Sequence, residues 1–185
     1  MRIARTLIFA LVALTLVGAS VASAQQPYIG VFFNRVGTPE QKNCPGVGLV
    51  DSLFFIAYNF NTNVVGIEFK VNYPASMSWV ADLETQPVTI GTTPTGMSMG
   101  WALPQNGFSP IFVSKALIQW NCGNCAVPDD PIQVVQHPFS GAPTPQFTQW
   151  PTITLHPAIG LTALVCRTVP VEDTTWGRVK SLYSE

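Results

Sequence analysis

The chain has 185 residues and a formal net charge of −1, with 47% hydrophobic and only 10% charged residues. This length fits one domain with its own core. Nucleic-acid binding is not expected, because neutralising phosphates requires clustered Lys and Arg that the sequence lacks. The 16 prolines and 14 glycines, with so few charges, indicate uncharged strands and loops. Such a surface is poorly protected against association, so self-association is one expectation.

The first 24 residues are typical of a secretory signal peptide. Arg2 and Arg5 precede an apolar run over 7–17, and small residues at 22–24 provide a cleavage site. The run is shorter than the ~20 residues that span a bilayer, so cleavage after Ala24 is favoured over retention as an anchor. We therefore expect a secreted protein in the periplasm, at the cell surface or outside the cell, with no membrane span after cleavage.

Short apolar runs broken by Pro or Gly fill the next part of the chain, which we assign to one domain over 25–170. The clearest run, VVGIEFKVNYP, alternates apolar and polar residues over 65–73 and predicts a half-buried strand. Asn61-Thr62-Asn63 before it predicts a hairpin turn from the preceding run. In chain order the predicted strands are 28–34, 49–60, 64–73, 78–83, 88–90, 97–102, 111–120, 132–135, 152–155 and 161–166.

No window shows the apolar spacing of a helix, so the sequence predicts an all-β domain. Eight to ten short strands favour a two-sheet antiparallel β-sandwich of the immunoglobulin-like type, with a closed barrel as the alternative. Two longer connections cover 34–46 and 137–151. The second contains Phe147 and Trp150, and we expect an ordered surface loop or a poorly pairing edge there.

The last residues, 171–185, differ from the rest. Pro170 ends the final strand, and Trp176, Val179 and Tyr183 fall on one side of a short predicted helix. This tail is expected either to pack Trp176 on the sandwich or to act as a docking or sorting element.

The segment from 64 to 120 carries the strings NVVGIEFKVNYP, MSMGWALP and PIFVSKALIQW. This run resembles the cohesin-like and related β-sandwich modules of secreted bacterial proteins, over about a third of the chain. The resemblance implies a β-sandwich fold. The four cysteines and the Trp-led tail are departures from the family pattern.

Cys44, Cys122, Cys125 and Cys166 form an even set in a chain expected to be exported, which favours disulfides. We favour Cys44–Cys166 with Cys122–Cys125, and the crossed pairings remain open. A thioredoxin-like role is disfavoured, because Pro128 and Pro131 prevent the required helix after Cys125. Zinc is a weaker alternative, with Cys122, Cys125, His137 and His156 as its ligands.

No catalytic motif is recognisable, so neither an enzyme nor a cofactor is expected. Asp82 with Glu84 and the Asp129-Asp130 pair are interpreted as solvated or turn-forming carboxylates rather than a glycosidase or calcium site.

The aromatic residues are the remaining candidate contacts. We expect Trp101 and Trp120 in the core, and Trp150, Phe147, Trp79 and Trp176 as possible partner or ligand contacts. The expected function is a non-catalytic binding, structural or adhesive module with a protein or glycan partner at the cell surface. The alternatives are a carbohydrate-binding module that uses exposed aromatics and a hydrolase whose site assembles only on folding.

Overall fold

The computed structural model describes residues 25–39, 42–123 and 130–166, and these residues form strands and connections without a helix. The prediction of an all-β domain is confirmed. The strands are β1 Tyr28–Phe32, β2 Val50–Tyr58, β3 Asn63–Asn72, β4 Met77–Leu83, β5 Val88–Thr92, β6 Gly96–Asn106, β7 Ile111–Trp120, β8 Asp130–Val135, β9 Gln146–Gln149, β10 Thr154–Pro157, β11 Ile159–Gly160 and β12 Thr162–Val165.

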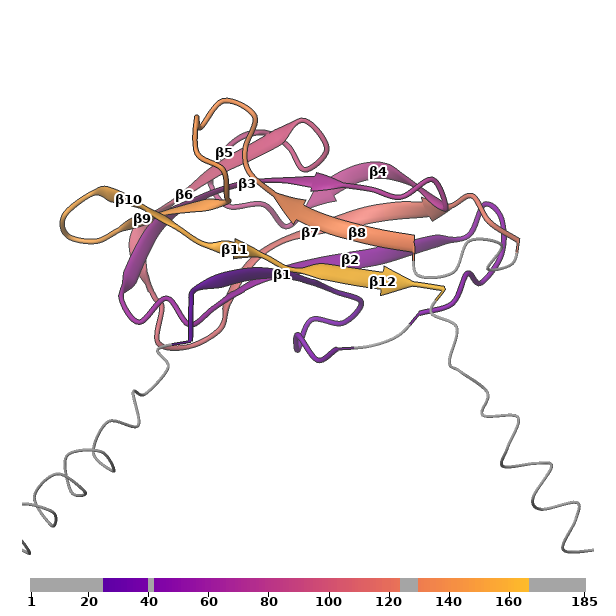
Figure 1. Cartoon of the computed structure of the whole chain (residues 1–185), viewed down its shortest axis with the longest axis horizontal. Coiled ribbons are helices and arrows are strands. Elements are labelled where there is room, and N and C mark those ends of the chain that lie inside the picture. The colour runs from indigo at the N-terminus through magenta and orange to yellow at the C-terminus, as the bar shows by residue number, and fades with distance from the viewer. Residues whose placement is uncertain (1–24, 40–41, 124–129, 167–185) are drawn as a thin grey trace, which may run out of the picture.

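Two sheets face each other in a sandwich (Figure 1). The five-stranded sheet has the order β11-β1-β2-β7-β4. The seven-stranded sheet has the order β10-β9-β3-β6-β5, and β8 pairs with the second half of β3 and with β12. All pairs of strands are antiparallel except β1 with β11, which is parallel. The predicted two-sheet architecture is therefore confirmed, with that one parallel pair as a departure.

The core lies between the sheets and follows from alternation along the long strands. In β3, Ile67, Phe69 and Val71 are buried while the residues between them face outward. Phe55 of β2 meets Phe69 across the gap, with ring centroids 5.5 Å apart. Trp120 at the end of β7 is fully buried, as predicted. Removal of this apolar surface from water is the main stabilising term of such a sandwich.

One side of the sandwich is closed by the last three strands. The chain leaves the seven-stranded sheet at β10, pairs with β1 through β11, and returns to β8 through β12. Leu161 contacts both sheets, because its N–H donates to Ile29 O at 2.9 Å and its carbonyl accepts from Val134 N at 3.3 Å. The domain therefore combines a sandwich with one barrel-like side, between the two alternatives that the sequence left open.

The predicted hairpin at Asn61-Thr62-Asn63 is wrong. β2 belongs to the five-stranded sheet and β3 to the seven-stranded sheet, so the connection crosses between layers. Asn59 and Asn61 have φ values of 59° and 53°, a left-handed conformation that asparagine tolerates better than most residues. The turn chemistry was recognised correctly, but it joins two sheets rather than two paired strands.

The segment 137–151, expected to be a surface loop or a poorly pairing edge, contains the interior strand β9. β9 pairs with β10 on one side and β3 on the other. Phe147 points into the core and is 4% exposed, with its ring centroid 4.4 Å from that of Phe60. Phe147 is therefore a core residue and not a surface contact.

A disulfide joins Cys44 to Cys122, with a Cα–Cα distance of 6.0 Å. The favoured pairings Cys44–Cys166 and Cys122–Cys125 are thus wrong, and a crossed pairing is correct. The cause is local: Gly48 N donates to Trp120 O at 2.7 Å, which aligns the segment before β2 with the end of β7. Cys166 is also disulfide-bonded, while Cys125 lies outside the described residues.

The predicted signal peptide over 1–24 and the tail over 171–185, including Trp176, lie outside the described residues. Within the described part of the chain, no helix has the length and apolarity needed to cross a membrane.

Candidate binding face

The outer surface of the seven-stranded sheet is built from the residues that alternate with the core. Cross-strand pairing places these residues in two rows that run across all five strands from β5 to β10. The first row is Val88, Gly100, Gly66, Thr148 and Leu155, and the second is Ile90, Ser98, Glu68, Gln146 and Pro157. Strands are spaced about 4.8 Å apart, so each row is about 20 Å long. We call these two rows the binding face.

The first row has little side-chain volume at Gly100 and Gly66, two of its five residues, because glycine has no side chain; we call this part of the row the trough. Gly66 and Gly100 are direct partners across β3 and β6. A Cβ atom on Gly100 would lie 3.5 Å from its nearest described neighbour, Val65 O, and the φ of Gly100 is outside the left-handed region. Neither packing nor backbone conformation therefore requires glycine there, although glycine within a strand costs roughly 0.5–1 kcal/mol relative to alanine. Glycine within a strand commonly marks a β-bulge or a site where a ligand or another backbone approaches closely, and the pairing of β3 with β6 shifts register next to this glycine pair.

Gly66 is under a different constraint. A Cβ atom there would lie 3.2 Å from Met99 O and 3.3 Å from Thr148 Oγ1. These contacts are tighter than ordinary van der Waals separations, so packing accounts for Gly66 in part.

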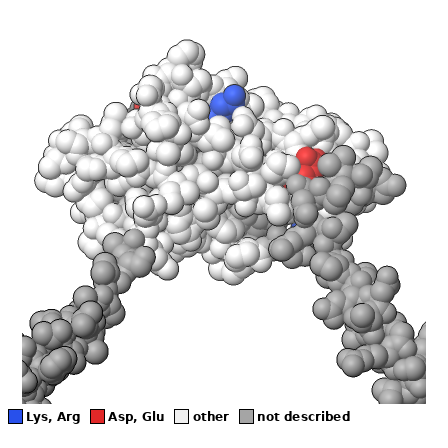
Figure 2. Space-filling model, in the orientation of Figure 1, with Lys and Arg blue, Asp and Glu red and all other residues white. Residues whose placement is uncertain are grey.

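Exposed apolar side chains frame the trough. Val88 and Ile90 on β5 and Leu155 on β10 are all largely exposed. Glu68 is the single charged residue in the two rows, and Ser98 Oγ donates to Glu68 Oε1 at 3.2 Å. The sequence has no charged residue over 85–114 or 131–166, which together supply four of the five strands. Figure 2 shows how little charge the visible face of the molecule carries.

A loop stands beside the second row. It follows β8, and its Phe139 is 89% exposed. Pro138 and His137 pack on Gly96, where a Cβ atom would lie 2.6 Å from Pro138 Cδ. Phe139 therefore adds another exposed ring near this face of the sheet.

The candidate carboxylate Asp82 forms hydrogen bonds that hold the strands together. Asp82 accepts from Thr93 N and from Thr93 Oγ1, both at 2.8 Å. Tyr73 OH is 2.6 Å from Thr93 Oγ1, and burial raises the pKa of the Tyr73 phenol well above its usual value. Tyr73 therefore stays protonated and donates to Thr93, which in turn donates to Asp82. This chain of bonds ties β4 of one sheet to the β5–β6 turn of the other.

Two other carboxylates have similar structural partners. Glu84 Oε2 lies 2.9 Å from Arg35 Nη1, and Asp130 Oδ2 accepts from Ser76 N at 3.3 Å. Asp129 lies outside the described residues. Asp82, Glu84 and Asp130 therefore all have partners within the framework.

The zinc alternative loses one of its ligands, because the Cys122 sulfur is bonded to Cys44. His137 Nδ1 accepts from Phe139 N at 3.3 Å, and His156 Nε2 lies 2.8 Å from Thr154 Oγ1. Among the described residues no group of three His, Cys, Asp or Glu side chains is placed to hold a metal ion.

The predicted contact residues do not come together. Trp150 is exposed at the β9–β10 turn, whereas Trp79 and Trp101 are partly buried against the core. Phe147 lies inside, and Trp176 is outside the described residues. Among the described residues, Trp150 is therefore the one predicted aromatic contact whose side chain is exposed.

The outer surface of the five-stranded sheet does carry several aromatic rings, but their faces are occupied. Tyr28 stacks on Tyr58 at 5.1 Å between centroids. The Arg35 guanidinium lies 4.6 Å from the centroid of Phe112, and Lys115 Nζ lies 5.8 Å from that of Phe54. A sugar needs a free ring face to stack on, so this surface does not support the carbohydrate-binding alternative.

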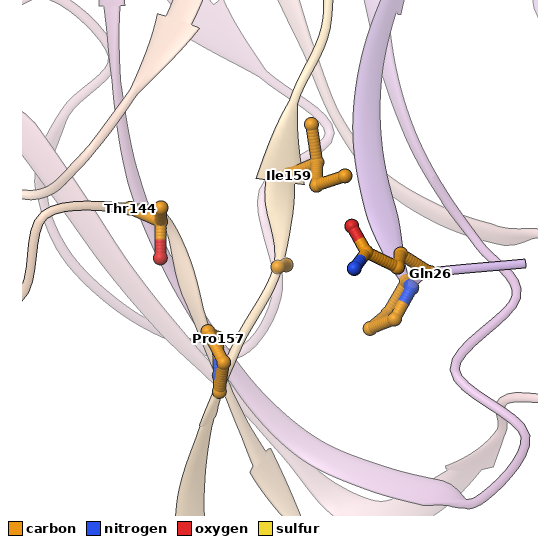
Figure 3. Close-up of a pocket in the computed structure, with 6 residues that line it drawn as sticks. Gln26, Thr144, Pro157 and Ile159 are labelled. Carbon is orange, nitrogen blue, oxygen red and sulfur yellow. The ribbon is translucent and has the colours of Figure 1, made fainter.

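A pocket of about 260 Å³ lies where β11 crosses between the sheets (Figure 3). It is lined by Gln26, Pro27, Thr144, Pro157, Ala158 and Ile159. Ligand sites usually enclose about 300–1,000 Å³ and combine apolar walls with several converging polar groups. This pocket is smaller and offers only the Gln26 amide and the Thr144 hydroxyl as polar side chains, so it is not the candidate site.

No protein-family model matches the sequence, and no curated protein matches it. Several solved structures that resemble it are cohesin modules. The third ScaB cohesin of R. flavefaciens, in complex with a group 1 dockerin, is 12% identical, with a TM-score of 0.48 over 78% of this chain and 97% of that one. The seventh ScaB type I cohesin of Pseudobacteroides cellulosolvens is 10% identical, with a TM-score of 0.47 over 80% and 96%.

A type III cohesin from the ScaE cell-surface anchoring scaffoldin of Ruminococcus flavefaciens is 11% identical, with a TM-score of 0.46 over 80% of this chain and 91% of that chain. The cohesin-like resemblance noted in the strand pattern is thus found again among solved structures. The description of the binding face depends on this chain's own strand register and not on these neighbours.

Sequence reasoning missed the binding face. The available signal was the presence of Gly66 and Gly100 inside predicted strands without turn residues beside them. Their cross-strand pairing depends on register, which the sequence alone did not provide.

Proposed function

We propose that this protein is a secreted, non-catalytic binding module that holds another protein against the binding face. The observation that carries the proposal is Gly100, a strand glycine that neither its backbone conformation nor its packing requires. A partner that lies flat in the trough gives this glycine a role, since its backbone can approach β3 and β6 closely.

The surroundings of Gly100 support a protein partner over a small molecule. Exposed apolar Val88 and Ile90 stand at one end of the binding face and Leu155 at the other. Exposed apolar side chains on a sheet face with few charges are typical of protein interaction sites. The binding energy is expected to come from these apolar contacts, with Glu68 and Thr148 setting the register of the partner.

The disulfide is consistent with export, because such bonds persist in oxidising compartments. We place the protein outside the cytoplasm, with its partner in the same compartment.

The test uses the exported protein and three variants of exposed positions. Partner proteins are captured from the secreted and envelope fractions of the source organism, purified, and titrated against the wild type. Val88→Arg and Gly100→Arg are expected to weaken binding at least about tenfold, because each places a long charged side chain in the interface.

Val50→Arg is the matched control. Val50 and Val88 are both 60% exposed, but Val50 lies on β2 in the other sheet. Its dissociation constant should equal that of the wild type. Equal binding by wild type and the two binding-face variants would show that the partner contacts another surface.

A further inference from the structure

One end of the sandwich carries exposed apolar side chains on neighbouring connections. Trp150 N donates to Asn63 O at 2.9 Å, and Asn61 N donates to Gly107 O at 3.2 Å. These bonds hold the β9–β10 turn, the β2–β3 connection and the β6–β7 turn next to one another, at the left of Figure 1. We name this region the apolar end and define it by Leu103, Phe108, Trp150 and Ile153.

The side chains of the apolar end protrude and do not line a groove. Leu103 is 75% exposed, Phe108 71%, Ile153 58% and Trp150 45%. Phe108, Trp150 and Ile153 stand on turns between strands, where a side chain can project beyond the body of the sandwich. This shape fits insertion into a soft surface better than a flat contact.

Ile153 keeps its exposed side chain in a strained backbone conformation. Its φ is 51°, in the left-handed region, where a β-branched residue is an outlier and Gly or Asn is far less strained. Its N–H is fixed by a bond to Gln149 O at 2.9 Å. A strained position that carries an exposed isoleucine suggests that the side chain itself is used, since strain of this kind persists mainly at functional sites.

The segments that form this end carry no charge. The ranges 52–67, 85–114 and 131–166 contain no Asp, Glu, Lys or Arg. A charged side chain in these segments would oppose insertion into a bilayer, and they contain none. A bilayer interface favours Trp, whose ring is apolar with one polar N–H.

The chain also enters the domain at this end. β1 begins at Tyr28, which pairs with Tyr58, the last residue of β2 before the β2–β3 connection. The start of the described chain therefore lies beside the apolar end.

From these observations we propose that the apolar end inserts into the interface of an uncharged lipid bilayer. This contact is separate from the binding face, so the protein can hold a partner while it lies on a membrane.

The test measures partition of the exported protein onto phosphatidylcholine vesicles by co-sedimentation and by the change in intrinsic tryptophan fluorescence that is lost in Trp150→Phe. Binding is expected without anionic lipid and should persist at about 0.5 M salt, because screening does not weaken apolar insertion. Ile153→Asn should reduce the partition coefficient about tenfold, since it removes an apolar side chain from the interface.

Ile153→Asn should not unfold the protein, because asparagine tolerates the left-handed conformation, and its melting temperature should equal or exceed that of the wild type. Val47→Asn is the matched control: Val47 is 70% exposed on the connection before β2, at the opposite end of that strand from Tyr58, and this variant should keep wild-type partition. Failure of the wild type to bind, dependence on anionic lipid, or equal loss in both variants would overturn the proposal. Lipid binding that is unchanged in Ile153→Asn, with loss of a protein partner instead, would assign the apolar end to that protein.

Discussion

At the scale of single residues, buried polar groups form hydrogen bonds that connect the two sheets of the sandwich. Thr93 is fully buried and lies between Tyr73 and Asp82, with its hydroxyl bonded to both. A buried polar group that loses its partner costs more than the bond itself contributed, because water cannot replace the lost contact. We therefore expect removal of the Thr93 hydroxyl to lower the free energy of unfolding by more than the net contribution of one hydrogen bond.

Thr93→Val tests this role, because it keeps the shape of the side chain and removes the hydroxyl. We expect the free energy of unfolding to fall by about 2–3 kcal/mol, as Tyr73 and Asp82 both lose a partner. Urea denaturation provides the measurement. The control is Thr162→Val on β12, an exposed position where water replaces the lost bonds, and its unfolding midpoint should stay close to that of the wild type. If Thr93→Val and Thr162→Val had the same urea unfolding midpoint, the Thr93 hydroxyl would not contribute to the stability of the fold.

At the scale of strands, the sequence predicts long elements well and their neighbours poorly. β7 was predicted with its observed bounds of 111–120, and β3 to within one residue at each end. Both are long enough for alternation to be clear. β9 and β11 were missed because four and two residues give too little pattern. Asn61-Thr62-Asn63 has the residues of a hairpin, yet which sheet receives the next strand depends on packing that local turn chemistry does not encode.

The same limit applies to the candidate sites. The cysteines were identified as disulfide-forming from their number, but their pairing depends on how Gly48 and Trp120 align two distant segments. Phe147 and Trp150 were grouped as surface residues because they lie three apart in a Pro-rich stretch. Their separation into core and surface needed the register of β9 against β3.

Gly66 and Gly100 allow a prediction at this scale, because they are paired but differ in the space around them. Gly66→Ala should destabilise the fold, since the added Cβ presses on Met99 O and Thr148 Oγ1. Gly100→Ala should be neutral or stabilise by up to about 1 kcal/mol, because alanine restricts the unfolded chain and fits the strand. Chemical denaturation of the two variants gives the comparison. If Gly100→Ala were as destabilising as Gly66→Ala, the fold itself would need this glycine and the argument for a ligand at Gly100 would lose its basis.

At the scale of the whole molecule, the two sheets are joined by links that are far apart in sequence. Leu161 bonds to a strand of each sheet on the closed side, and the Asp82–Thr93 contact joins β4 to the turn after β5. Within the five-stranded sheet, the Cys44–Cys122 bond adds a covalent link between the segment before β2 and the end of β7. A framework held in this way can present both the binding face and the apolar end without moving.

The covalent link is expected to carry a large share of the stability. Cys44 and Cys122 are 78 residues apart, and closing a loop of that length constrains the unfolded chain by about 4–5 kcal/mol in the chain-entropy model. The double variant Cys44→Ser, Cys122→Ser should therefore lose most of the stability of a small domain, measured by guanidinium denaturation without reductant. Peptide mapping of the unreduced wild type should first recover the Cys44–Cys122 link, and it should recover Cys166 linked to Cys125, the remaining cysteine of the sequence. A double variant that unfolds at the wild-type midpoint would mean that strand pairing alone holds the two segments together, and that the disulfide serves resistance to proteolysis rather than folding.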